Sequence, residues 1–408
     1  MNSVPNLRFK EFSGEWESQP LSKLGTFFKG TGLSKADLSD EGNPCVLYGE
    51  LYTKYTEVIA NVKSKTNVEL GNAVIGKIND VLIPSSGETA VDIATASCLQ
   101  QDDVILGGDL NVFRSNQVNG IFTSYQLNTS KKFEIAKLAQ GASVVHVYND
   151  QLKKLKLSVP TIEEQEKIAS FFSLIEKKIE LQTEKVEELK NYKKGIMQKI
   201  FSQELRFKDE NGNEYPEWKL GRLGEYLINK GGTPLEKYVE DEGTYNFISI
   251  GNYSVDGNYI DTGQRINLND KTHEKLLNKN DLVMVLNDKT ASGDLIGSTI
   301  LIDEDNKYIY NQRSERLICN SAISPDFCWI LLNSKMFRRK VFSIAQGGTQ
   351  IYVNFSSVKN LEIELPHLKE QEKIVHFIFN LNTKLNKEQE KLDGLNQYKK
   401  GLLQQMFI

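Results

Sequence analysis

EEQEKI at residues 163–168 and KEQEKI at residues 369–374 share the five-residue core EQEKI. The two cores begin at Glu164 and Glu370, so the second copy follows the first at an offset of 206 residues. A segment that recurs at such a distance calls for a search for a longer internal repeat, because a repeat changes the interpretation of the whole fold.

The match extends far beyond the EQEKI core. At the same offset, NYKKGIMQKIF (191–201) corresponds to QYKKGLLQQMF (397–407), and AQGASVVHVYNDQLKKLKLSVP (139–160) corresponds to AQGGTQIYVNFSSVKNLEIELP (345–366). LRFK recurs at 7–10 and 205–208, where the offset is shorter, so the second copy carries insertions. The sequence therefore predicts a duplicated unit, a globular domain followed by a long helix. We expect the domains at 1–158 and 205–364, and the helices at 159–204 and 365–408.

Both predicted helices carry an apolar stripe whose members alternate at steps of four and three residues, the pattern of a coiled-coil seam. Polar residues interrupt the stripe at matching places, Gln182 and Lys193 in the first helix and Glu388 and Lys399 in the second. The seam positions that we assign are Ile168, Phe172, Ile175, Ile179, Gln182, Val186, Leu189, Ile374, Ile378, Leu381, Leu385, Glu388, Leu392 and Leu395.

A single helix of this kind is unstable alone, so we expect the two copies to pair. In an antiparallel pair Gln182 and Glu388 meet near the middle, where a buried polar contact fixes the register. A helix of about 40 residues is roughly 60 Å long, so the pair would be a rigid spacer between the domains. The other reading is that each helix packs on its own domain.

Aromatic residues also recur off the seam, at matching positions of the two helices. They form either the docking sites of a partner subunit, one per repeat, or contacts with the neighbouring globular domain. These residues are Phe171, Tyr192, Phe201, Phe377, Tyr398 and Phe407.

The composition is that of a globular protein, with 39% apolar and 25% charged residues. Four cysteines without a C-x-x-C motif fit reduced thiols rather than a zinc site. Reduced thiols are typical of a cytoplasmic protein, which is what we expect here. The longest apolar runs are far too short to span a membrane. The net charge of −4 gives no general indication of nucleic-acid binding.

Short apolar runs separated by Gly, Asn and Asp predict strands and turns, among them DVLIPSS (80–86) and DLVMVLND (281–288). Helices are expected near 129–139 and 326–344, which makes both domains mixed α/β. The sequence lacks the nucleotide P-loop, H-E-x-x-H and G-x-S-x-G. We therefore assign no catalytic residue and no metal ligand to this chain.

Small polar loops recur instead, among them KGTG (29–32), KGGTP (230–234), SSGET (85–89), NDKTASG (287–293) and NQRSER (311–316). Such loops offer backbone N–H groups, Lys and Arg to phosphates, and Asn, Gln and Arg to base edges. Each loop alone is better explained as a turn between strands. As a set placed alike in both domains, they favour a recognition surface.

Two variable domains alternating with two similar helices resemble the specificity subunit of type I restriction–modification enzymes. The residues that carry the resemblance are VPTIEEQEKI, LPHLKEQEKI, KGGTP at 230–234, AQGGTQIYVNF at 345–355 and the repeated YKKG. The chain departs from the family at Thr161 and His367, where a second proline is common, and in KGTGLSK, which stands where the second domain has KGGTP.

The resemblance implies two target recognition domains, each reading one half of a split site in double-stranded DNA. It implies helices that form an antiparallel coiled coil, set the spacing and dock two modification (methyltransferase) subunits, with two ATP-dependent restriction subunits in the larger complex. This chain would hold no cofactor, since S-adenosylmethionine, ATP and Mg²⁺ belong to those partners. The DNA-binding candidates are Lys29, Thr31, Glu50, Ser86, Arg114, Gln140, Lys230, Thr233, Asn252, Lys289, Arg313, Arg316, Gln346 and Thr349.

The alternative from another class is a non-enzymatic scaffold that binds proteins through two mixed domains. A stand-alone nuclease is a third reading, and the sequence offers no acidic metal-binding cluster for it. The DNA target, the length of the gap, the half-site that each domain reads, and the presence of a restriction subunit do not follow from the sequence.

Overall fold

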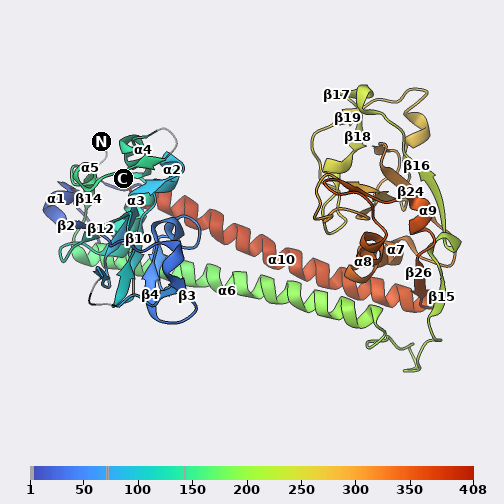
Figure 1. The fold of residues 1–408 in the computed structure, drawn as a ribbon, viewed down its shortest axis with the longest axis horizontal. Helices are drawn as coiled ribbons and strands as arrows, with labels where there is room; N and C mark the ends of the chain where they lie inside the picture. The colour runs from blue at the N-terminus through green and yellow to red at the C-terminus, as the bar shows by residue number, and fades with distance from the viewer. Residues whose placement is uncertain (1–3, 70, 72, 142–143) are drawn as a thin grey trace. The chain divides into compact units, whose positions relative to one another are not determined.

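The computed structural model describes residues 4–69, 71, 73–141 and 144–408. The chain divides into two compact units, one formed by Met1–Glu184 with Gln389–Ile408 and the other by Lys185–Glu388. Each unit contains a mixed α/β domain and one part of each of two long helices, α6 (Ile162–Phe201) and α10 (Leu368–Met406) (Figure 1). The tandem α/β architecture predicted from the repeat is confirmed.

The first domain is built on two five-stranded sheets and two short strand pairs. One sheet has the order β2-β12-β8-β10-β5, the other β3-β6-β4-β11-β7, and the pairs are β1-β14 and β13-β9. The strands are β1 (Glu17–Pro20), β2 (Thr26–Lys29), β3 (Leu38–Ser39), β4 (Asn43–Val46), β5 (Val58–Ile59), β6 (Ser64–Thr66), β7 (Ile75–Gly76), β8 (Val81–Pro84), β9 (Ser86–Gly87), β10 (Ser97–Leu99), β11 (Val104–Leu106), β12 (Leu110–Arg114), β13 (Val145–His146) and β14 (Lys156–Val159). The short helices are α1 (Leu21–Leu24), α2 (Ala90–Ile93), α3 (Gly120–Asn128), α4 (Lys132–Leu138) and α5 (Asn149–Leu152).

The second domain repeats this plan with one edge strand fewer in each sheet. Its sheets have the orders β16-β24-β20-β22 and β17-β19-β18-β23, and its pairs are β15-β26 and β21-β25. The strands are β15 (Lys219–Arg222), β16 (Leu227–Gly231), β17 (Val239–Glu240), β18 (Tyr245–Ile248), β19 (Arg265–Ile266), β20 (Leu282–Val285), β21 (Asn287–Asp288), β22 (Thr299–Leu301), β23 (Tyr308–Tyr310), β24 (Ser314–Cys319), β25 (Ile351–Tyr352) and β26 (Glu362–Leu365). The helices are α7 (Pro325–Leu332), α8 (Lys335–Ser343) and α9 (Phe355–Val358).

The predicted helix at 326–344 is two helices in the structure, because α7 ends at Leu332 and α8 begins at Lys335. The Ser334 hydroxyl accepts a hydrogen bond from the backbone N–H of Phe337 and so caps α8. In the first domain α4 occupies the predicted 129–139 segment.

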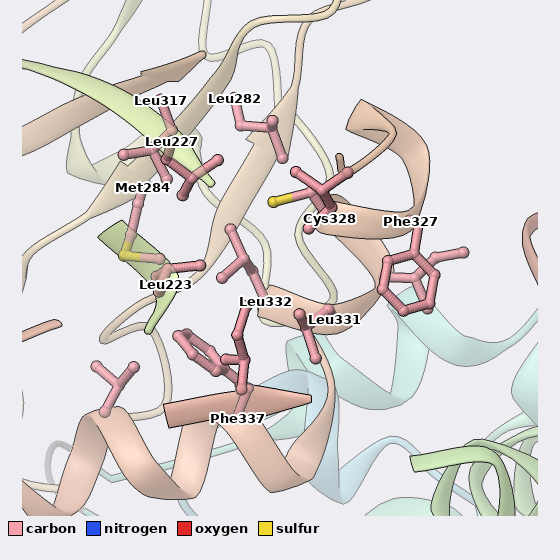
Figure 2. Packing of buried hydrophobic residues seen from close by; sticks show 14 of the residues in the cluster. Leu223, Leu227, Leu282, Met284, Leu317, Phe327, Cys328, Leu331, Leu332 and Phe337 are labelled. Atoms are coloured by element: carbon pink, nitrogen blue, oxygen red, sulfur yellow. The ribbon is translucent and has the colours of Figure 1, made fainter. Parts of the chain in front are cut away.

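The core of the second domain that Figure 2 shows lies between the β16-β24-β20-β22 sheet and the helices that cover it. Leu227, Leu282 and Leu317 project from three neighbouring strands toward α7 and Phe337 of α8 (Figure 2). Burying side chains of this size is the main stabilising contribution to such a domain. Ile200 and Ile374 belong to the same core, so both long helices are anchored in it.

The EQEKI core anchors each long helix to its domain through a buried carboxylate. Arg8 donates two hydrogen bonds of 2.7 Å to Glu164, and the indole of Trp16 donates to the same carboxylate at 3.4 Å. In the second unit, Arg206 and Trp218 hold Glu370 in the same way. A buried carboxylate needs such partners, because an unpaired charge away from water is costly.

The glutamine of each EQEKI segment connects the start of the long helix to a shorter helix of the same domain. The side-chain oxygen of Gln165 accepts from the backbone N–H of Asn119, which caps α3, while its amide donates to the carbonyl of Pro160. Gln371 makes the equivalent bonds with Ser324, the cap of α7, and with Pro366. The repeated Pro-x-x-x-Glu-Gln segment is therefore the joint between helix and domain.

The two long helices run antiparallel within each unit. In the first unit Phe172 of α6 packs on Phe407 of α10, and Glu176, one turn further along α6, pairs with Lys399, about two turns earlier in α10. In the second unit Lys185 lies 3.0 Å from Glu388. All fourteen seam residues assigned from the sequence are buried or half-buried.

The predicted contact between Gln182 and Glu388 falls on the boundary between the two units and stays a prediction. The antiparallel coiled coil and the packing of each helix on a domain are not exclusive alternatives, because the same stripe serves both. Val186 and Glu388 are buried in the second unit, and Ile168, Phe172 and Ile175 belong to a core of the first.

The start of each domain follows the end of a long helix in the same manner. The backbone N–H of Leu205 donates to the carbonyl of Lys199 at the end of α6. In the first unit the N–H of Leu7 donates to the carbonyl of Gln405 at the end of α10, although these residues stand at opposite ends of the chain. Within the first unit, the start of the first domain therefore lies against the end of α10, as the start of the second domain lies against the end of α6.

Candidate nucleic-acid interface

Backbone hydrogen bonds gather four polar loops of the second domain into one surface. The N–H of Leu286 donates to the carbonyl of Arg313, and the N–H of Val353 donates to the carbonyl of Leu286, both at 2.8 Å. Thr233 forms a bridge with Asn311. We call residues 232–235, 286–290, 311–314 and 346–353 the second loop cluster.

The first domain holds the same arrangement. The N–H of Ser85 donates to the carbonyl of Asp109 at 2.7 Å, and the N–H of Val147 donates to the carbonyl of Ser85 at 3.0 Å. Thr31 forms a bridge with Gly107. Residues 30–33, 85–89, 107–110, 140–141 and 144–147 make up the first loop cluster, and the hydrogen bonds align each of its loops with a loop of the second.

Five candidates are exposed in the second loop cluster, where a duplex could reach them. The phenol of Tyr352 donates to the side-chain oxygen of Gln346 at 3.2 Å, which orients that amide. The five exposed candidates are Thr233, Lys289, Arg313, Gln346 and Thr349.

Asp288 holds the loop that carries Lys289. Its buried carboxylate accepts from the N–H and hydroxyl of Thr290 and from the N–H of Leu295, at 2.7–2.9 Å. Burial by itself raises the pKa of Asp288, but these hydrogen bonds outweigh burial and bring the pKa below its usual value. The loop is therefore built around an ionised aspartate.

The first loop cluster exposes fewer of its candidates. Gln140 is exposed, and Lys29, adjoining the cluster, lies over the ring of Tyr148 with its ammonium 5.6 Å from the centroid. Thr31 is half-buried, and its hydroxyl bonds to the carbonyl of Leu106 and the N–H of Val74. Ser86 is buried in β9, so its side chain is not open to DNA.

Glu50 and Asn252 are turn residues rather than DNA contacts. Glu50 accepts from the N–H of Leu47 and from Lys54, and Asn252 accepts from the N–H of Ser249. Both side chains are buried, and each closes an equivalent turn in its domain. A polar side chain inside a domain satisfies backbone groups there, so we correct the assignment of these two residues.

Arg114 and Arg316 are committed to buried acids. Arg114 donates twice to Asp80, at 2.7 and 2.6 Å, and Arg316 lies 2.7 Å from Asp281. Both aspartates are buried. These pairs stabilise the ends of strands, and neither arginine offers a free guanidinium fork to a base.

Lys29 and Lys230 do not occupy the same position, although both begin a KG segment. The bridges Thr31–Gly107 and Thr233–Asn311 set the alignment, and they place Lys29 two residues before its threonine and Lys230 three residues before. Lys230 donates to the carbonyl of Glu274 at 3.2 Å. The two lysines therefore lie at non-equivalent positions of the two domains.

The aromatic residues off the helix seam form three pairs that differ in exposure. Phe201 and Phe407 are buried in the domain cores, which contradicts their assignment as docking residues, because a ring inside a core is not available to a partner. Phe171 packs on Phe9 and Phe377 packs on Phe207, so both are half-buried. The two remaining members, Tyr192 and Tyr398, are 53% and 58% exposed.

Sequence reasoning missed Asp109, His146 and Tyr352. The offset of 206 residues aligns His146 with Tyr352, so the sequence alone contained a signal that these two residues occupy equivalent positions. Asp109 had none, because its correspondence to Arg313 depends on strand pairing and not on the repeat offset.

Among the described residues, no cluster of His, Cys, Asp or Glu is suited to hold a metal ion. None of the described helices is long and apolar enough to cross a membrane.

The fold and the duplicated loop clusters define a class of protein, a tandem pair of recognition domains carried on two long helices. Residues 13–191 and 215–397 match the family described as the type I restriction modification DNA specificity domain. The chain belongs to this family, and it is a DNA specificity subunit that performs no catalysis itself.

Curated relatives and solved structures agree with this assignment. The chain is 24% identical to the MjaVIII specificity subunit of Methanocaldococcus jannaschii over 97% of its own length and 94% of the relative. It is 20% identical to the StySPI specificity subunit of Salmonella potsdam, over 88% and 80%. The crystal structure of the S subunit from M. genitalium shares the fold with a TM-score of 0.60 at 17% identity, covering 99% of both chains.

Proposed function

We propose that each loop cluster lies against one half of a divided site in double-stranded DNA. The observation that carries the proposal is the alignment of the two clusters by the same backbone hydrogen bonds while their exposed residues differ. Asp109 stands where the second domain has Arg313, and His146 stands where it has Tyr352. One scaffold with two sets of side chains is what reading two different half-sites requires.

The paired helices set the distance between the two readers in this proposal. A helix of about 40 residues is roughly 60 Å long, and the domains cover part of it, so a separation near one DNA turn, ~34 Å, keeps both readers on one side of the duplex. Inserting whole helical turns into both helices should lengthen the gap in the recognised site while both half-sites stay the same.

Two modification subunits dock on the helices, one per repeat, and Tyr192 and Tyr398 are the exposed aromatic residues that we assign to this contact. The methyltransferase chemistry and S-adenosylmethionine belong to those partners, and ATP and Mg²⁺ belong to restriction subunits. With a net charge of −4, the chain alone should bind DNA weakly, because the partners supply most contacts to phosphates.

Co-expression with a modification subunit, followed by genome-wide mapping of methylated adenines, tests the proposal. We expect a divided motif with a gap of fixed length, and co-purification of two modification subunits per chain. The two-domain protein scaffold, the alternative from another class, is not favoured by membership in the DNA specificity family. Methylation independent of this chain would contradict the proposal.

A further inference from the structure

One short turn occupies the same place in both loop clusters. It joins β11 to β12 in the first domain and β23 to β24 in the second. Its last residue is Asp109 in one and Arg313 in the other, with φ of 55° and 65°. Both side chains are exposed. The turn thus presents opposite charges at equivalent positions of the two domains.

The backbone at this position gives no reason for an arginine. The left-handed region suits Gly, Asn and Asp, and a longer side chain is disfavoured there. Among the described non-glycine residues with positive φ, only Gln203 and Arg313 are neither Asn nor Asp. An outlier of this kind is a reason to look for a function of the side chain.

The surroundings leave the Arg313 guanidinium available. Among the described residues, none accepts a hydrogen bond from it, in contrast to the buried pair that Arg316 forms with Asp281. Its charge does reach Glu236. Burial raises the pKa of Glu236, and hydrogen bonds from Asn311 and Gln312 together with the charge of Arg313 bring it below its usual value.

We infer that this turn contacts a base in each half-site. Arg313 binds a guanine, and Asp109 binds the exocyclic amino group of a base. The inference rests on the proposed function and adds the residues and the chemistry of the contact. A guanidinium donates two parallel hydrogen bonds to O6 and N7 of guanine in the major groove. The planar fork, which lysine lacks, makes this contact specific.

Asp109 supports the assignment by its charge. A carboxylate cannot lie against a phosphate without repulsion, so an exposed aspartate in a DNA-facing turn needs a donor on a base edge. The N4 amino group of cytosine, or the N6 amino group of adenine, is such a donor. The hydroxyl of Ser85 lies 3.5 Å from the Asp109 carboxylate and helps to orient it.

The test uses the full chain in complex with a modification subunit and maps methylated adenines for R313G, R313K and D109N. R313G keeps a backbone that tolerates positive φ and removes the side chain. We expect it to relax one G·C position in one half-site, raising methylation of mismatched sites roughly 10- to 100-fold relative to the cognate site. R313K should relax the same position, and D109N one position of the other half-site.

R339A is the matched control, because Arg339 is an exposed arginine of α8 outside the loop cluster, and its motif should equal that of the wild type. Thermal unfolding of R313G should match or exceed that of the wild type. A strict motif with R313G, an equal loss of methylation at all sequences, or relaxation of a position other than G·C would overturn the inference. A wild-type complex without any divided motif would instead overturn the proposed function.

Discussion

Arg206 holds Glu370 through two hydrogen bonds of 2.8 Å, from Nε to Oε1 and from Nη2 to Oε2. Glu370 is fully buried at the start of α10, and Trp218 donates a third hydrogen bond to it. This contact and the equivalent one between Arg8 and Glu164 explain why the EQEKI segment occurs in both repeats.

The first prediction concerns this joint. R206A should destabilise the second unit by about 3–5 kcal/mol, because it leaves a buried carboxylate without its partner. Chemical denaturation of the purified chain measures the change. R265A is the control, since Arg265 makes an equally short pair with Asp261 on an exposed surface, where such pairs contribute little. Equal effects of the two substitutions would contradict the role of the joint.

The second prediction compares two lysines at matching positions of the helices. Lys399 pairs with Glu57 and Glu176, whereas burial lowers the pKa of Lys193 and the charge of Asp256 opposes this effect only in part. K399M should therefore cost about 2–3 kcal/mol, while K193M should be neutral or stabilising. Urea denaturation of both variants tests this, and a larger loss for K193M would refute it.

The third prediction is the pH dependence of these two sites. Burial lowers the pKa of Lys399, but Glu57 and Glu176 outweigh burial and raise it above its usual value, so its contribution is present below about pH 10 and lost at higher pH. Because the folded pKa of Lys193 is lowered, the unfolded state binds more protons there, and stability gains as pH rises toward about 10. Comparing K399M and K193M with the wild type from neutral pH to above pH 10 separates the two contributions.

The fourth prediction distinguishes the structural role of Arg316 from the base contact proposed for Arg313. R316A leaves the buried Asp281 without its partner and should cost about 3–5 kcal/mol at neutral pH, without changing the recognised motif. Burial already raises the pKa of Asp281, so this cost should shrink as pH falls and the carboxyl becomes neutral. A relaxed motif in R316A at full stability would contradict this prediction, because it would show that Arg316 contacts DNA and that its pair with Asp281 is not needed for folding.

The fifth prediction follows from the contact between Leu7 and Gln405. Because Leu205 makes the same backbone bond with Lys199, a chain that begins at Leu205, continues through a short linker from Ile408 to Val4 and ends at Glu204 should fold. Its circular dichroism spectrum and its methylation motif should equal those of the wild type. Loss of helical structure would show that the covalent link between α6 and Leu205 is required.

The repeat, the α/β class and the helix seam could be predicted because they depend on local periodicity and on identical segments. The seam from Ile168 to Leu395 is a pattern of apolar side chains, and that pattern directly reports which face is buried. The joint at Glu164 was less visible. Acids at a helix start are commonly explained by the helix dipole, and the partner arginine lies more than 150 residues away.

The site was predicted only in part, because residue type does not reveal whether a polar side chain faces the solvent or a buried partner. Arg313 and Arg316 stand three residues apart, yet one is exposed and the other is paired with Asp281. Phe201 and Tyr192 are both aromatic residues off the helix seam, and only the tyrosine remains exposed. Long-range packing decides these outcomes.

Genome-wide mapping of methylated adenines for a chain whose residues 1–158 are replaced by the equivalent domain of another specificity subunit tests the central claim most directly. Two independent readers on one scaffold predict that one half-site changes while the other half-site and the gap stay as in the wild type. Changes in both half-sites, or a motif without a gap, would contradict the account.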